Sequence, residues 1–105
     1  VAFAAGPAAA HARLVNATPA ANSTVAPTRS VSLTFSERSV PAFSSFDVIN
    51  AAGEKVAIRV STSEDGKTLV GTLARPLAAG AYRVEWRIAS SDGHRMTGSH
   101  SFSVR

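Results

Sequence analysis

The sequence has 105 residues, 45% hydrophobic and 17% charged, a balance that fits one globular domain and excludes a disordered or fibrous chain. It has no cysteine, which excludes disulfides, a thiolate zinc centre and a thiolate copper(I) centre. The net charge of +4 comes from 11 basic and 7 acidic side chains scattered singly along the sequence, so no dense basic run predicts nucleic-acid binding.

The first ten residues carry no charge and end in Ala8-Ala9-Ala10, the small-residue pattern that signal peptidase cleaves after. We therefore expect residues 1–10 to be the remnant of an export signal and residues 11–105 to form the domain. Cleavage after Ala10 would make His11 the first residue of the mature protein. No stretch reaches the roughly 18 consecutive apolar residues that a membrane-spanning helix needs.

From His11 onward, short stretches of alternating apolar and polar residues are separated by Pro, Gly, Asn and Asp, a pattern typical of strands and turns. The first five predicted strands span residues 13–17, 31–36, 43–49, 56–60 and 69–73. A helical period is absent except for a few residues at 76–79.

A long alternating run at residues 82–88 places Tyr82 and Trp86 on its apolar face, and a last strand places Phe102 and Val104 in the core. Asp65-Gly66 predicts a hairpin turn, since glycine adopts positive φ without strain. About seven short strands at this spacing predict an all-β protein, an antiparallel Greek-key sandwich or barrel.

Residues that could bind a metal are concentrated at His11 and in Asp92-Gly93-His94. An amino-terminal histidine offers a ring nitrogen and its own α-amine, so it can chelate a metal alone. Asp92 and His94 add a carboxylate and an imidazole two residues apart, on a turn that Gly93 allows. These nitrogen and oxygen donors suit tetragonal copper(II), although zinc accepts similar ligands.

The other candidates are expected to be structural. His100 shares strand parity with Phe102, so it should lean towards the core, and Met96 should pack beside the site. For Asp92 and His94 the simpler interpretation is a turn whose aspartate caps its own backbone.

Several motifs over the whole of residues 11–105 together resemble the CopC family of copper-binding and copper-resistance proteins. They are the opening His11-Ala-x-Leu14, Thr18-Pro19, Asn22-Ser23, Leu33-Thr-Phe-Ser-Glu37, Pro76-Leu77 before Ala79-Gly-x-Tyr82, Trp86, and Ser91-Asp92-x-His94-x3-Gly98-x3-Phe102-x-Val104. The last of these is the most specific.

The resemblance implies an immunoglobulin-like, cupredoxin-like sandwich that carries or buffers copper(II) in the periplasm, without catalysis. It implies that His11 gives amine and imidazole nitrogens, His94 a second imidazole and Asp92 an oxygen, in a histidine brace. Glu37 matches an acidic residue near the family's site, and we expect it to act on the ligands without coordinating copper. Some members also carry a methionine-rich copper(I) site. Because this chain has a single methionine, Met96, we expect one copper(II) site only.

Two other functions fit parts of the pattern. Polysaccharide-cutting copper monooxygenases also use an amino-terminal histidine brace, but they need an open axial position and a flat aromatic face. A metal-free immunoglobulin-like interaction module would need only the sandwich and the signal. The resemblance implies a membrane copper transporter of the CopD type, separate or fused, as partner, and we expect a monomer. While Ala10 stays attached, the nitrogen of His11 is an amide, and the brace could not form.

Overall fold

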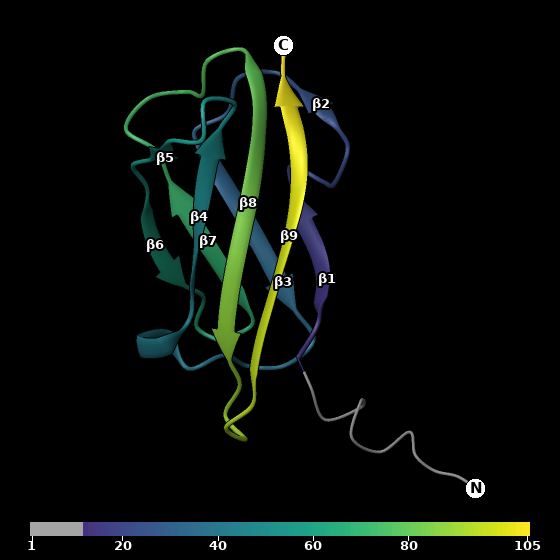
Figure 1. The fold of residues 1–105 in the computed structure, drawn as a ribbon. Coiled ribbons are helices and arrows are strands. Elements are labelled where there is room, and N and C mark those ends of the chain that lie inside the picture. Colours follow the sequence, from purple (N-terminus) through teal and green to yellow (C-terminus); the bar gives the residue numbers. More distant parts are fainter. Residues whose placement is uncertain (1–11) are drawn as a thin grey trace, which may run out of the picture.

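A computed structural model describes residues 12–105 as two β-sheets packed face to face (Figure 1). Within these residues there are nine strands and one short 3-10 turn, η1. Their bounds are β1 Leu14–Thr18, β2 Thr24–Val25, β3 Ser30–Phe35, η1 Pro41–Phe43, β4 Ser45–Asn50, β5 Lys55–Val56, β6 Arg59–Thr62, β7 Thr68–Thr72, β8 Gly80–Ala89 and β9 Arg95–Val104. The predicted all-β sandwich is confirmed.

One sheet has the strand order β1-β3-β7-β6 and the other β2-β9-β8-β4-β5. The second sheet is built around the β8–β9 hairpin, whose strands have ten residues each and pair from Gly80 with Val104 to Ala89 with Arg95. Figure 1 shows this hairpin running the length of the molecule, with its connecting turn beyond the ends of the other strands. The residues of that turn are therefore held by a long, continuous ladder.

The core fills the space between the sheets because alternate residues of β3 and β8 are apolar and face inward, and apolar residues of the other strands pack against them. Tyr82 and Trp86 are buried, as the alternation predicted. Trp86 meets Phe35 of the opposite sheet edge to face, with 5.0 Å between ring centres. Its cross-strand partner is Gly98, and a side chain there would overlap the indole ring. The glycine of the last sequence motif thus makes room for the tryptophan.

Some sequence-based expectations need correction. The third strand does not begin at Phe43, because Pro41 opens the 3-10 turn η1 and leaves that ring 63% exposed. Residues 76–79 contain no helix. The strand β2, within a stretch expected to be a loop, pairs parallel to β9, since the chain crosses between sheets there. No helix among the described residues is long and apolar enough to cross a membrane.

His100 and Met96 both lie on the inward side of β9, as expected. Met96 packs against the core cluster. The Nε2 atom of His100 lies 3.3 Å from the carbonyl oxygen of Pro19, in the connection that crosses from β1 to β2. Its buried Nδ1 atom has no hydrogen-bond partner among the described residues. His100 therefore has a structural position inside the sandwich, away from the β8–β9 turn.

Candidate metal centre

The turn between β8 and β9, residues 90–94, brings Asp92 and His94 together. Gly93 has a φ of 92°, a left-handed conformation that glycine adopts without strain, and its N–H donates to the Ser90 carbonyl at 2.9 Å. The Ser90 N–H donates to the His94 carbonyl at 2.9 Å, which closes the turn. The turn geometry expected for Asp92-Gly93-His94 is therefore present.

The Asp92 carboxylate contacts the His94 ring directly, with 3.0 Å between Oδ2 and Nδ1. Its Oδ1 atom accepts a hydrogen bond from the His94 backbone N–H at 3.1 Å. Both side chains are partly exposed, at 51% for His94 and 41% for Asp92. Two donor atoms at this separation can bind one metal ion side by side, once the proton between them is lost.

Ser90 anchors this pair and was missed at the sequence level. Its side chain is buried, and its hydroxyl donates to Oδ1 of Asp92. The Ser90 hydroxyl, the His94 ring and the His94 amide together hold the pKa of Asp92 below its ordinary value. Asp92 is thus kept as a carboxylate, the form that accepts hydrogen bonds and binds metals.

The buried polar side chains of the described residues are three serines, Ser39, Ser44 and Ser90, and all three lie beneath this turn. The Ser44 hydroxyl accepts a hydrogen bond from the Ala89 N–H at 3.1 Å. Ser39 forms an isolated bridge with Ser90. Buried hydroxyls persist when they satisfy backbone groups that water cannot reach. These serines fix the backbone from which Asp92 and His94 project.

A second turn, between β6 and β7, repeats the pattern. Ser63-Glu-Asp65-Gly-Lys67 matches Ser90-Ser-Asp92-Gly-His94 in its serine, aspartate and glycine positions. There too the serine hydroxyl donates to the aspartate Oδ1, at 2.6 Å, and the N–H two residues later donates to the same oxygen, at 2.9 Å. The hydrogen bonds are therefore a general turn device. The histidine in place of lysine gives the β8–β9 turn an imidazole beside the carboxylate.

Residues 36–40 connect the start of the described chain with the candidate site. At one end the Ser36 N–H donates to the Arg13 carbonyl at 2.8 Å. The Arg13 N–H donates in return to the Ser36 hydroxyl at 3.0 Å. At the other end the Val40 N–H donates to the Ala89 carbonyl at 2.8 Å. Glu37 lies exposed on this connection, between the β1 end and the β8–β9 turn. Its expected action on the metal ligands stays a prediction.

His11 lies outside the described residues, so its proposed ligand role stays a prediction. The next residue, Ala12, is fully buried in the core, and Arg13 is fixed by Ser36. Residues 12–105 contain no group of three or more His, Cys, Asp or Glu side chains that could hold a metal. Of the three predicted ligands, the structure brings together Asp92 and His94, and a complete site needs at least one further donor.

Comparison with known proteins gives one family match over most of the chain. The model of the CopC domain matches residues 14–105. Copper resistance protein C of Xanthomonas campestris pv. juglandis is 37% identical over 103 residues, covering 91% of this chain and 81% of that protein. Copper resistance protein C of Pseudomonas syringae pv. tomato is 41% identical over 103 residues, covering 91% of this chain and 82% of that protein.

Solved structures agree with the sequence matches. PcoC, described as a methionine-rich copper resistance protein from Escherichia coli, superimposes with a TM-score of 0.84 and 37% identity. That alignment covers 91% of this chain and 100% of PcoC. CopC from Methylosinus trichosporium has a TM-score of 0.83 and 33% identity, covering 90% of this chain and 93% of that protein.

Proposed function

Because this chain belongs to the CopC family, we propose that it binds copper(II) and carries or buffers it in copper resistance and homeostasis. The proposed ligands are the amine and imidazole of His11, the imidazole of His94 and the carboxylate of Asp92. The proposed compartment is the periplasm, reached by export and cleavage after Ala10. We also propose that the protein is a monomer and that a membrane transporter of the CopD type is its partner in copper transfer.

The proposal rests mainly on one observation: a carboxylate and an imidazole lie side by side on a turn that a buried serine holds in place. Asp92 and His94 are in contact, and buried Ser90 fixes the carboxylate. Preformed donors lose little conformational freedom when the metal binds, which favours tight binding. Imidazole nitrogen and carboxylate oxygen are donors that suit copper(II) in tetragonal geometry.

The α-amine of His11 is a ligand that only the cleaved, mature chain would have. A free α-amine has an ordinary pKa of about 7.7–8.0, so copper(II) displaces its proton readily at neutral pH. With Ala10 still attached, the same nitrogen is a peptide amide, which holds its proton far more strongly. Ala12, the next residue in the chain, is buried at the end of the sandwich that bears Glu37, and this supports the proposed role of His11.

We expect no copper(I) site of soft ligands. PcoC is described as methionine rich, whereas this chain has one methionine. That residue, Met96, packs against the core, so its thioether is committed to side-chain packing. One thioether gives too few soft donors to hold copper(I). The proposed role is also non-catalytic, and release of oxidised sugars from a polysaccharide by the copper-loaded, reduced protein would contradict it.

The test compares two forms of the chain, one beginning at His11 and one retaining Ala10. Copper(II) affinity is measured by competition with a chelator, and the nitrogen ligands are counted by electron paramagnetic resonance. We expect tight binding only when His11 is first, and a loss of more than about 100-fold with His94→Ala, since removing a ligand exceeds the 10–100-fold effect of removing a neighbour. Asp65→Ala, in the matching turn without histidine, is the control. Equal affinity of the two forms would refute the role of the amine.

A further inference from the structure

The charge of the protein is divided unevenly between the two ends of the sandwich. Five basic side chains and one acidic side chain lie at the end opposite the β8–β9 turn: Arg29, Lys55, Arg59, Arg75 and Arg105, with Glu54. The remaining described residues carry six basic and six acidic side chains. This set of residues therefore carries a formal charge of +4, and the other described residues are balanced; among them is Arg83, which lies level with Lys55 in the sheet and pairs with Glu85.

The fold gathers these cations from segments far apart in the sequence. The start of β3, the end of β7 and the start of β6 are adjacent, because Ser30 and Arg59 both pair with Thr72. Arg29 donates a hydrogen bond to the Ala74 carbonyl at 2.6 Å, next to Arg75 in the β7–β8 connection.

The other sheet ends at the same place. Gly80, at the start of β8, pairs with Val104, beside Arg105, and the β4–β5 turn with Lys55 follows Asn50, which pairs with Tyr82. The Leu77 N–H donates to the Thr28 carbonyl at 3.0 Å, which joins the two halves of this end. Figure 1 shows the C-terminus, β2 and the start of β8 together at this end, away from the β8–β9 turn.

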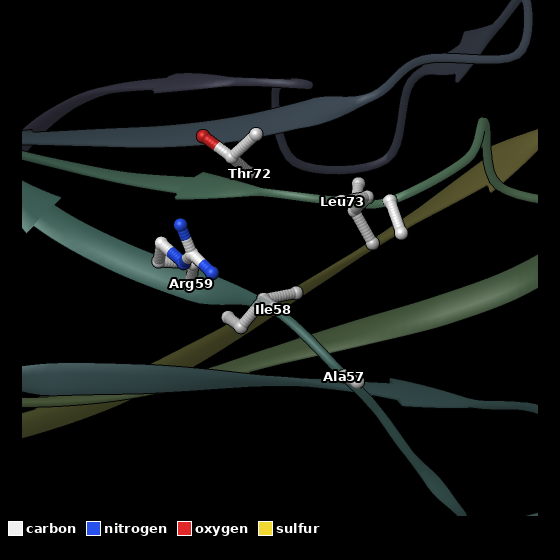
Figure 2. Close-up of a pocket in the computed structure, with 6 residues that line it drawn as sticks. Ala57, Ile58, Arg59, Thr72 and Leu73 are labelled. Carbon is white, nitrogen blue, oxygen red and sulfur yellow. The ribbon is translucent and has the colours of Figure 1, made fainter.

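These cations are directed to solvent. The five basic residues are all exposed. A hollow of about 410 Å³ lies beside them, and Figure 2 shows Arg59 and Thr72 on neighbouring strands with Ile58 and Leu73 further along. Lys55 also reaches Asp47, at 3.6 Å, so the arginines carry most of the unbalanced charge. This end thus presents several exposed guanidinium groups to solvent.

We infer that this basic end, formed by Arg29, Lys55, Arg59, Arg75 and Arg105, binds the anionic phosphate headgroups of a phospholipid surface. Cations that are spread over a surface suit phosphates that are spread over a lipid surface, because each long side chain can contact a separate phosphate. A protein partner would be expected to use a buried aromatic or aliphatic anchor. The exposed large hydrophobic residues of the described chain are Val15 and Phe43, and neither lies at this end.

The orientation that follows places the sandwich upright on the membrane, with the β8–β9 turn directed into the solvent. Copper is not required for this binding, since none of the basic residues belongs to the proposed metal site. The inference and the copper proposal can therefore fail separately.

The experiment measures co-flotation of the metal-free protein with vesicles of phosphatidylcholine alone and of phosphatidylcholine mixed with phosphatidylglycerol. We expect binding only to the mixed vesicles, weakening as salt rises. Arg59→Gln with Arg75→Gln should lower the partition coefficient about 25-fold, from about fivefold for each cation. Arg38→Gln with Lys67→Gln removes the same charge at the other end and should leave binding nearly unchanged.

Equal losses for the two double variants would show that net charge acts without the basic end, and would overturn the inference. Failure of the unaltered protein to bind mixed vesicles at low salt would also overturn it, and would leave an acidic protein as the class of partner to test. Melting temperatures of all variants are measured alongside, because only folded protein can be compared. Copper affinity should be the same for both double variants.

Discussion

Replacing Ser90 by alanine tests whether the buried hydroxyl positions the metal ligands. Asp92 receives three hydrogen bonds, one from Ser90 and two from His94. Without the Ser90 hydroxyl, the carboxylate stays bonded to the histidine but loses its hydrogen bond to a buried side chain of the turn. Loss of a group that orients a ligand lowers metal affinity by about 10–100-fold. Because Asp92 keeps two bonds and is partly exposed, we expect the lower limit, about tenfold.

The assay is chelator competition for copper(II), using protein that begins at His11, together with thermal unfolding of the metal-free form. Two controls separate positioning from stability. Ser44→Ala leaves the buried Ala89 N–H without its hydroxyl acceptor, so it should destabilise the fold by about 1–3 kcal/mol and leave copper affinity unchanged. Ser63→Ala alters the matching turn that lacks a histidine. A tenfold loss in either control, or none in Ser90→Ala, would refute the reasoning.

Three further predictions concern the rest of the fold. Gly98→Ala should destabilise the protein by about 1–3 kcal/mol and shift the fluorescence of Trp86, because the added methyl group overlaps the indole. Hydrogen bonds from a serine hydroxyl and a backbone N–H lower the pKa of Asp65, so its stabilising effect should be full above its unfolded pKa of about 3.9 and disappear as the pH falls through the lower folded value. Urea unfolding of Asp65→Asn across this range measures the effect. Neutral His100 should carry its proton on Nε2, which faces the Pro19 carbonyl, and long-range nitrogen–proton correlation spectra would identify this tautomer.

Each of these has a result that contradicts it. An unchanged melting temperature and emission spectrum in Gly98→Ala would mean that the strand pair adjusts freely, and Ser99→Ala on the outer face is the control. A constant stability difference between wild type and Asp65→Asn down to the lowest pH would argue against the lowered pKa, with Glu64→Gln as the neighbouring comparison. A proton on Nδ1 of His100 would argue against the contact with the carbonyl.

Much of the fold could be predicted because alternation is a local signal. Tyr82 and Trp86 are buried where their parity placed them, and the glycines at 66 and 93 form turns with positive φ. Phe43 was misplaced because Pro41 interrupts the strand, so alternation no longer reports which side chains face inward. The parallel pairing of β2 was also not predicted, since it depends on where the chain crosses between sheets.

Only part of the candidate site could be predicted from the sequence. Asp92 and His94 stand two residues apart in the sequence, so one turn suffices to join them. The role of Ser90 depends on burial, which the sequence does not report for a residue as common in turns as serine. The repeat of serine, any residue, aspartate and glycine at both hairpins is the signal that could have identified it. The basic end likewise arises only when strands distant in sequence align their ends.

Burial of Ala12 bears on the order of events in the proposed export and cleavage after Ala10. Its side chain is fully enclosed by the folded domain, and Arg13 is held by two hydrogen bonds to Ser36. A peptidase that cuts after Ala10 must draw the flanking residues, including Ala12, into its own cleft as an extended strand. The folded domain and the peptidase therefore compete for the same few residues. Maturation would have to precede closure of this end of the sandwich, so a precursor that folds too early would keep its leader and lack a free amine for copper.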